Sequence, residues 1–470
     1  MITKISRLNA GMLACIAAAP ALANAQSPDS KPNIVFILAD DMGWKDLACY
    51  GNPHTETPNI DGLAKSGIRF TQAYAACPVS SPTRASILTG KYPARLQLTN
   101  FIAGNRTDPA SPVLPAQWKP YLEAREVTIA ELLKEKGYTT GMVGKWHLGS
   151  HDSIAPWSQG FDYTRMIGKN GLDYFNYSIF EDSYKKEFTD KGSDYLTDKL
   201  TDYGVDFIGR SGGKPFFLYL AYSAPHVVIV PRPDKMMKYF RKYGQADEKF
   251  NPYYSAMVES IDDGVGRIVK FLRDNGLLEN TIIFFTSDNG GLGMDELGPT
   301  PTSNLPLRKW KGHIYEGGIR VPAIVSWYGK IEQGRVLEEY FSSVDYFSTI
   351  CEAAGIKNIP QEVDGVSFLN VLTGTGKMNS ERTLYWHYPH FSNQLGRPAG
   401  AIRKGDFKLV ENYETGKTEL YNLKNDIAES EDLSEKMKSK TEELLLMLVK
   451  WRKELNASMP LANPDYKLEK

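Results

Sequence analysis

Short, uninterrupted apolar runs recur along the first two thirds of the chain. The clearest is residues 34–39, Ile-Val-Phe-Ile-Leu-Ala, which is rich in β-branched residues and has polar neighbours on both sides. Such runs are typical of strands buried on both faces of a parallel sheet. The other runs of this kind are residues 139–143, 216–221, 281–286 and 321–327.

Apolar residues recur at helical spacing in the segments between these runs. Residues 128–136 and 254–274 are the clearest examples, and Gly137 and Gly276 follow their ends. Glycine favours the left-handed conformation in which helices often terminate. Alternating strands and helices predict an α/β fold with a large mixed, mostly parallel sheet that has helices on both faces.

The pattern changes after about residue 370. Short segments separated by Gly, Pro or Asn predict strands at residues 383–388, 399–403, 407–411 and 419–423. A long amphipathic stretch over residues 429–456 predicts one helix. We therefore expect an N-terminal catalytic domain over residues 26–370 and a smaller C-terminal domain, an antiparallel sheet with one packed helix, over residues 371–470.

The first 25 residues have the features of a secretory signal peptide. Lys4 and Arg7 precede a mostly apolar stretch that ends in a small-x-small cleavage site at residues 23–25. We therefore predict a periplasmic or secreted protein. Cys15 lies in a sequence that only faintly resembles a lipoprotein cleavage box, so a lipid anchor is the less favoured alternative. The stretch is too short to span a bilayer, and we expect no membrane span.

The charge and cysteine content of the chain limit the classes of molecule that it can be expected to bind. The chain has 470 residues, with 55 Lys and Arg against 56 Asp and Glu, for a formal charge of −1. A near-neutral chain has no general attraction to nucleic acid or to anionic membranes, so any anion recognition must be local. Four cysteines without a C-x-x-C pair exclude a disulfide framework and a typical zinc site.

Acidic residues follow two of the predicted strands at their carboxyl ends, where open α/β sheets bind ligands. Asp40 and Asp41 follow the first strand, and Asp288 and Asn289 follow residues 281–286 closely. Three neighbouring carboxylates repel one another unless a cation neutralises them, and oxygen ligands suit Ca²⁺ or Mg²⁺ better than zinc. Each motif alone could be a helix cap or a turn, but together they favour a metal site.

A short helix is predicted between Pro82 and Gly90, with Ser80 just before it. The free N–H groups at its start would point at Ser80, which is an anion-binding arrangement. Arg84 lies one turn into the helix and adds a planar cation suited to a tetrahedral oxyanion. The alternative is an ordinary capped helix with a surface arginine.

Further cations and proton carriers follow buried strands. Lys145 and His147 are spaced by two, so that they would point the same way in an extended chain. His226 follows another strand, and Lys309 and Lys311 lead into a glycine-rich segment. A single His or Lys in such a place is more often structural or solvated, but their shared position favours one common site.

These motifs resemble the type I sulfatase family of the alkaline-phosphatase superfamily. The family pattern Cys/Ser-x-Pro-Ser-Arg-x-x-x-Leu-Thr-Gly is matched by residues 80–90, with Thr83 in place of Ser. Residues 144–149 and 311–320 match two further family signatures. In the family pattern the first residue, Cys or Ser, is enzymatically modified and stands two residues before Pro and four before Arg. Only Ser80 has this spacing from Pro82 and Arg84, so the modified residue is Ser80 rather than Cys77. The resemblance implies an alkaline-phosphatase-like fold and a sulfuric ester hydrolase.

The resemblance also implies the chemistry. In this family the Cys or Ser is oxidised to Cα-formylglycine (3-oxoalanine), for the serine form by a maturing radical enzyme, and the hydrated gem-diol attacks sulfur. Its second hydroxyl then allows release of free sulfate, which an unmodified Ser80 could not achieve without a second attack by water. The implied Ca²⁺ ligands are Asp40, Asp41, Asp288, Asn289 and residue 80.

The other implied roles concern charge and protons. Arg84 steadies the hydrate, Lys145 and Lys311 neutralise sulfate oxygens, His147 is the base for sulfate release, and His226 is the acid for the leaving alcohol. Lys309 competes with Lys311, but the family places its lysine directly before the glycine, which favours Lys311.

A carbohydrate-binding rim is expected in the C-terminal region. His387, His390 and Arg397 lie in a segment rich in aromatic residues, and such side chains suit sugar faces, hydroxyls and carboxylates. The alternative is that they are ordinary strand-end residues. The resemblance implies a sulfated carbohydrate substrate, and we expect a terminal sugar such as galactose sulfate or N-acetylgalactosamine sulfate.

Two other functions stay open at this stage. A phosphatase or phosphodiesterase of the same superfamily would use two zinc ions and several His ligands, whereas the close pair His387 and His390 is far in sequence from the acidic motifs. A protein that binds sulfated glycans without cleaving them would result if Ser80 stays unmodified.

Overall fold

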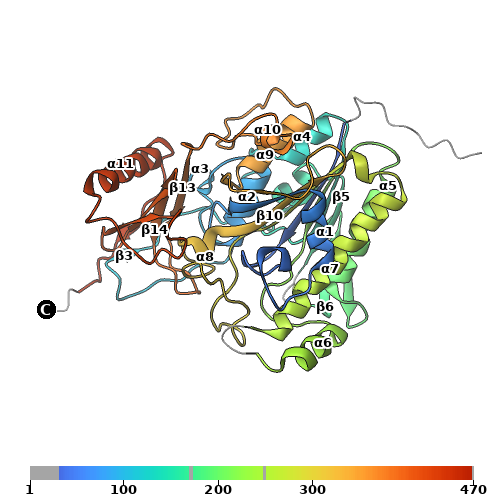
Figure 1. Ribbon diagram of the computed structural model, residues 1–470, viewed down its shortest axis with the longest axis horizontal. Helices are drawn as coiled ribbons and strands as arrows, with labels where there is room; N and C mark the ends of the chain where they lie inside the picture. The colour runs from blue at the N-terminus through green and yellow to red at the C-terminus, as the bar shows by residue number, and fades with distance from the viewer. Residues whose placement is uncertain (1–30, 169–172, 247–249, 468–470) are drawn as a thin grey trace, which may run out of the picture. The chain divides into compact units, whose positions relative to one another are not determined.

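The predicted apolar runs form the centre of a large mixed sheet (Figure 1). The computed structural model describes residues 31–168, 173–246 and 250–467, so the predicted signal peptide, with Cys15, lies outside the described residues. In sheet order, the strands are β11 (Arg335–Leu337), β2 (Ile68–Tyr74), β10 (Arg320–Trp327), β9 (Thr281–Ser287), β1 (Asn33–Ala39), β8 (Phe216–Ala221), β4 (Thr139–Gly144), β5 (Tyr163–Ile167), β6 (Asn176–Glu181) and β7 (Glu187–Lys191), and β12 (Phe341–Ser342) pairs with β2.

The five strands β9, β1, β8, β4 and β5 are parallel to one another, which confirms the predicted α/β class. Every residue of β1 is buried, because alternate side chains enter the cores on the two faces of the sheet. The register aligns the ends of these strands: Ala39 pairs with Ser287, and Gly144 pairs with Ala221. The segments that follow these strands therefore leave the sheet at one edge.

One strand departs from the expected direction. β10 is antiparallel to both β9 and β2, whereas its continuous apolar run was interpreted as a parallel strand. All but one of its residues are buried. Burial on both faces produces the same apolar pattern in either direction, so the pattern did not determine the strand's orientation.

Helices cover both faces of the sheet. One face packs against α1 (Pro58–Ser66), α5 (Leu196–Arg210) and α7 (Pro252–Asp274), with α6 (Pro233–Tyr243) on α7. The other face packs against α2 (Ser80–Thr89), α4 (Ile129–Glu135) and α9 (Asp345–Ala353). The predicted helices at 128–136 and 254–274 correspond to α4 and α7; Thr128 caps α4 through a capping box. The short helices are α3 (Pro93–Leu96), α8 (Glu316–Ile319) and α10 (Leu369–Leu372).

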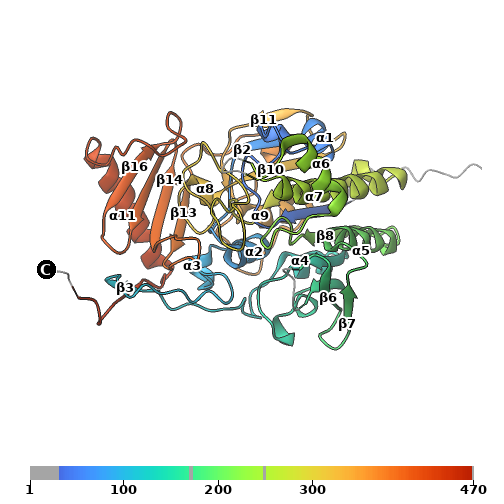
Figure 2. The same cartoon turned by 90° about the horizontal axis from the view of Figure 1, so that it is seen from below.

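The predicted C-terminal antiparallel sheet is confirmed (Figure 2). Its strands, in order, are β13 (Thr383–Tyr388), β14 (Ala399–Lys404), β15 (Phe407–Asn412) and β16 (Thr418–Asn422), and a two-stranded pair joins β3 (Val113–Leu114) to β17 (Leu461–Ala462). α11 (Lys438–Glu454) packs on this sheet through Leu444, Leu448 and Trp451. The expected helix over 429–456 was too long at its start, because Glu429 has a positive φ of 52° and residues 430–437 form turns.

The expected boundary between residues 370 and 371 falls inside α10. Val371 and Leu372 belong to the core of the large sheet, and the C-terminal sheet begins at Thr383. The described residues between 31 and 467 form one compact unit, so the two sheets share one body.

A buried charged cluster connects the two sheets. Lys408 on β15 donates from Nζ to Glu316 Oε1 at 2.9 Å and to Glu429 Oε1 at 2.8 Å, and all three side chains are fully buried. Glu316 begins α8, next to β10 of the large sheet. Burial and the neighbouring Glu316 raise the pKa of Glu429 to about 7, despite Lys408. Burial would also raise the pKa of Glu316, but Lys408 and other cations lower it to about 2.

Across the part of the chain that the structure describes, no helix is both long enough and apolar enough to cross a bilayer.

Candidate active site

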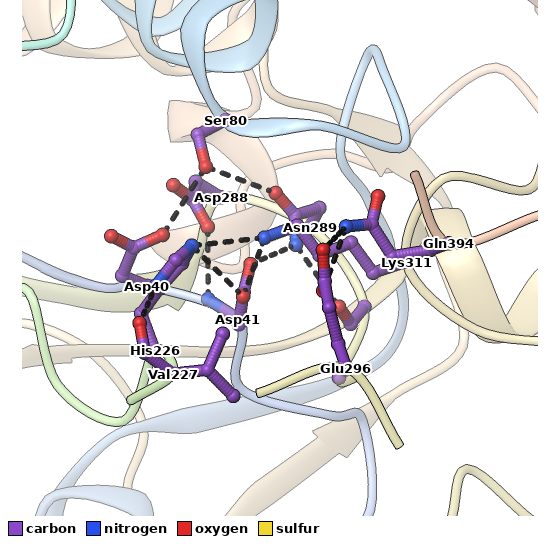
Figure 3. A network of polar contacts seen from close by, with 12 residues as sticks. Asp40, Asp41, Ser80, His226, Val227, Asp288, Asn289, Glu296, Lys311 and Gln394 are labelled. Carbon is purple, nitrogen blue, oxygen red and sulfur yellow. Dashed lines mark hydrogen bonds and ion pairs between the residues drawn. The ribbon is translucent and has the colours of Figure 1, made fainter. Parts of the chain in front are cut away.

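The acidic residues predicted to form one site meet at the carboxyl ends of β1 and β9 (Figure 3). The backbone N–H of Asp41 donates to Asp288 Oδ1 at 3.1 Å, and Asn289 Nδ2 donates to Asp41 Oδ1 at 2.7 Å. Asp40, Asp288 and Asn289 are fully buried, and Asp41 is 1% exposed. The parallel register therefore brings these acidic and amide side chains together, as expected for residues that follow neighbouring parallel strands.

Ser80 is the first residue of α2, and its side chain points at the acidic group. Ser80 Oγ donates to Asp40 Oδ1 at 3.2 Å and lies 3.4 Å from Asn289 Oδ1. The helix starts two residues earlier than predicted, since proline is tolerated in a first turn, and it ends at Thr89, before Gly90, whose φ is +70°. The helix start thus holds the hydroxyl against the acids.

Arg84 is fully buried, which excludes the surface-arginine alternative. Its Nε and Nη2 donate to Asp288 Oδ2 at 2.9 and 2.7 Å, and its Nη1 donates to the carbonyl of Lys145 at 2.9 Å. The planar guanidinium therefore joins α2 to the segments that follow β9 and β4.

Two lysines complete the positive charge. Lys145 Nζ bonds to Asp40 Oδ2, and Lys311 Nζ donates to Asp41 Oδ2 at 2.6 Å. Lys309 is instead exposed and lies over the ring of Trp310, so the geometry agrees with the choice of Lys311. Together with Arg84, the two lysines balance the three buried carboxylates.

These charges shift the pKa values of the acids in opposite directions. Burial would raise the pKa of Asp40, but Lys145, His226 and Arg84 hold it well below its usual range. Burial and the neighbouring Asp40 raise the pKa of Asp288 to about 6, despite Arg84. The site thus contains one strongly anionic carboxylate beside one that binds a proton more readily.

His226 faces the lysine and the acid. Its Nε2 lies 3.1 Å from Lys311 Nζ and 3.5 Å from Asp41 Oδ2, and its Nδ1 contacts the carbonyl of Val227. A carbonyl can only accept, so the neutral ring carries its proton on Nδ1 and has a lone pair on Nε2. Burial and Lys311 lower the pKa of His226.

His147 does not contact the acids directly. Its Nε2 lies 3.4 Å from the carbonyl of Ile102, while its buried Nδ1 has no partner among the described residues. Burial and the nearby Lys145 lower its pKa well below the ordinary value. His147 has a φ of +59°, so the chain is not extended there as we assumed, yet Lys145 and His147 line the same cavity.

The cavity that these residues share has a volume of about 640 Å³, within the range of small-molecule sites. We call it the active-site cavity. Its polar side is formed by Asp40, Lys145, His147, Ser223 and His226, and its other wall by Met166, Ile167, Phe180, Tyr184 and Glu187.

The second wall was missed from the sequence. It comes from β5, β6, the turn between β6 and β7, and the first residue of β7, and we did not predict these short strands. The aromatic and β-branched residues around 174–180 were the available signal, because such residues are enriched in strands.

The expected carbohydrate rim requires a correction. His387 is 4% exposed, and its ring nitrogens bond to Tyr413 Oη at 2.8 Å and to the carbonyl of Ser458 at 2.9 Å. His390 is 1% exposed and bonds through Nε2 to Thr99 Oγ1 at 2.8 Å. Neither ring can reach a substrate in this conformation, because both side chains pack into the protein interior.

Arg397 is exposed, but it lines a different cavity, of about 310 Å³. Its guanidinium pairs with Asp108 at 2.5 Å and with Glu414 at 2.6 Å. Arg397 is therefore separate from the active-site cavity, and its charge is already balanced by two carboxylates.

Comparison with protein families decides the identity of this site. The family model described as Sulfatase matches residues 32–356, which include all the acids, cations and histidines of the cavity. The chain belongs to the sulfatase family. This sulfatase is a sulfuric ester hydrolase with an alkaline-phosphatase-like fold. A second model, described as N-sulphoglucosamine sulphohydrolase, C-terminal, matches residues 309–457.

Several relatives of the sulfatase support this assignment. A protein named Sulfatase from Formosa agariphila is 33% identical, over 88% of this chain and 87% of its own. An N-acetylgalactosamine-6-sulfatase from Canis lupus familiaris is 36% identical, over 76% of this chain and 68% of its own. The crystal structure of Ps i-CgsB in complex with k-i-k-neocarrahexaose has a TM-score of 0.80 and 29% identity, and covers 93% of this chain and 96% of that one.

Arg84→Lys is expected to lower kcat/KM of the sulfatase about a hundredfold. A lysine ammonium cannot contact Asp288 through two nitrogens and also reach the Lys145 carbonyl, so the segments around residue 80 would lose their alignment. Steady-state kinetics with a thermal melt would measure this. A loss below threefold with an unchanged melting temperature would contradict the positioning role.

Proposed function

We propose that this sulfatase hydrolyses the sulfate ester of a terminal carbohydrate residue, with residue 80 as formylglycine and Ca²⁺ at the acidic group. The observation that carries the proposal is the position of Ser80, whose hydroxyl lies between Asp40 and Asn289 at the start of a buried helix. Two similar proteins, the N-acetylgalactosamine-6-sulfatase from Canis lupus familiaris and Ps i-CgsB in complex with a neocarrahexaose, support a sulfated sugar such as galactose or N-acetylgalactosamine sulfate. The predicted signal peptide over residues 1–25 supports an exported enzyme.

The donor set fits a hard divalent cation. Oxygens of Asp40 and Asn289 converge on Ser80 Oγ within 3.4 Å, and Asp41 and Asp288 adjoin them. A cluster of Asp40, Asp41 and His226 also has ligand atoms within 4.8 Å of one another, but Lys311 already occupies the lone pair of His226. Oxygen donors without thiolates favour Ca²⁺ over zinc. When bound, Ca²⁺ would polarise a sulfate oxygen and give the otherwise balanced site a net charge of about +2.

The side chains of the chain itself supply the remaining chemistry. The oxidised residue 80 would supply a hydrated carbonyl as the nucleophile. Lys145 and Lys311 would neutralise the oxygens of the transferring sulfate, each contributing about 2 to 4 kcal/mol to the barrier reduction. His226 Nε2 faces the cavity beside Lys311 and, once protonated, would donate that proton to the leaving alcohol; the unpartnered Nδ1 of His147 provides a second proton carrier.

Co-expression with an anaerobic radical maturase tests the proposal. Sulfate release would be measured on a panel of monosulfated monosaccharides and on matched phosphate esters, with Ca²⁺ and after chelation by EGTA. We expect release from a sulfated sugar, loss of activity with EGTA, recovery with Ca²⁺, and an active-site peptide lighter by about two hydrogen masses. Full activity with an unchanged peptide mass would contradict the formylglycine mechanism. Binding without turnover by the oxidised protein would instead favour a glycan-binding protein.

A further inference from the structure

The apolar wall of the active-site cavity contains a row of side chains that crosses three strands. Met166 on β5 pairs directly with Phe180 on β6, and Phe180 pairs with Glu187 on β7. Directly opposed residues of antiparallel strands project from the same face of a sheet. All three line the cavity that contains Lys145 and His226, so the row faces the reacting groups.

The aromatic ring of this row is held by neighbouring rings. Tyr184, in the turn between β6 and β7, packs edge-on against Phe180 with ring centroids 5.1 Å apart and against Trp157 at 4.7 Å. Edge-to-face pairs of this kind fix ring orientation. The ring of Phe180 therefore forms a preformed surface, and the β6–β7 hairpin lies at the edge of the large sheet (Figure 2).

Polar atoms without partners accompany this surface. The hydroxyls of Tyr184 and Ser223 and the Nδ1 of His147 are buried and have no hydrogen-bond partner among the described residues. All three residues line the active-site cavity. Buried polar atoms normally have partners, so these atoms are suited to the hydroxyls of a ligand.

Glu187 adds a negative charge to the far end of the row. Its side chain is exposed and forms no ion pair within the described ranges 31–168, 173–246 and 250–467. A carboxylate accepts hydrogen bonds from sugar hydroxyls but repels a sulfate or a carboxylate group. The cations of the site lie instead around Asp40 and Asp41.

We propose that Met166, Phe180 and Tyr184 bind the apolar face of the sugar that carries the scissile sulfate. We further propose that Glu187 selects a sugar without a second anionic group beside it. This inference rests on the proposed function and narrows its substrate class to monosulfated sugars without an adjacent uronate or sulfate.

The test uses variants of the matured enzyme. Phe180→Leu is expected to lower kcat/KM about tenfold on the monosulfated sugar that the panel identifies, while Phe180→Tyr retains turnover. The inhibition constant of inorganic sulfate should stay unchanged, because sulfate binds to the cations alone. Phe188→Leu is the matched control, since Phe188 pairs with Ile179 on the other face of the hairpin and lies over Lys199 Nζ at 5.3 Å.

Glu187→Gln tests the charge selection. The disulfated substrate is the same sugar with a second sulfate group. The ratio of its kcat/KM to that of the monosulfated sugar should rise about fivefold, because the substitution removes the repulsion between one unit charge and the second sulfate at a solvent-exposed position. An unchanged ratio, or equal losses for Phe180→Leu and Phe188→Leu, would overturn the inference. Turnover of 4-nitrophenyl sulfate by the wild type separates the cases: no sulfate release from this ester or from any sugar would contradict the proposed function itself.

Discussion

Ser80→Ala is expected to reduce sulfate-ester hydrolysis by the matured enzyme by about 10⁴-fold or more, which is the scale seen when a nucleophile is removed. Alanine cannot be oxidised to an aldehyde, and it removes the oxygen that lies 3.2 Å from Asp40 Oδ1. The acids, the lysines and Arg84 do not depend on this hydroxyl for their mutual contacts. The variant should therefore fold and bind substrate while losing turnover.

The measurement is kcat on the sulfated sugar, with binding of the same sugar followed by calorimetry. Ser86→Ala is the matched control, because Ser86 lies on the same buried helix but bonds to the carbonyl of Thr83 at 2.7 Å and to Ser343 Oγ at 2.5 Å, and not to the acidic residues. We expect the control to keep its activity within about threefold, because the lost hydrogen bonds affect stability rather than the reacting groups. Retention of a tenth of wild-type activity by Ser80→Ala would show that residue 80 is not the nucleophile.

The positions of the acidic residues of the site could be predicted because they depend on strand ends. β1 and β9 are recognisable from uninterrupted apolar residues, and the acids follow them directly. Because β1 and β9 are adjacent and parallel and Ala39 pairs with Ser287, the residues that follow the two strands must lie side by side. The same argument extended to Lys145 and His226, which follow β4 and β8.

Other features depended on contacts that the local sequence does not contain. The burial pattern of β10 does not indicate that the strand is antiparallel. The burial of His387 depends on Tyr413 and Ser458, which are 26 and 71 residues away in the sequence. The local sequence alone therefore led to the interpretation of an exposed carbohydrate-binding rim. The cavity wall from β5 to β7 was missed because its short strands carry both exposed and buried residues.

Lys408→Met is expected to destabilise the protein by about 3 to 5 kcal/mol, the usual loss when one partner of a buried ion pair is removed. Methionine leaves the carboxylates of Glu316 and Glu429 buried together without the ammonium that bonds to both. Lys404→Met is the control, because Lys404 lies on the neighbouring strand and pairs with Glu443 at a partly exposed site. Surface pairs of that kind contribute about 0 to 1 kcal/mol.

Guanidinium unfolding curves at several pH values would measure the loss of stability in each variant. The sign of its pH dependence follows from the pKa values of Glu316 and Glu429. Without Lys408, the folded-state pKa of Glu429 stays above its unfolded value and the pKa of Glu316, which Arg320 still contacts, rises, so the folded state binds more protons than in the wild type. Stability is then greatest below the unfolded pKa and is lost as the pH rises through the folded pKa, which is already about 7 for Glu429 in the wild type. The destabilisation should therefore be smaller at low pH, and Glu429→Gln in the Lys408→Met background should reduce it at neutral pH. A loss equal to that of Lys404→Met at every pH would show that the charges connecting the two sheets do not stabilise the fold.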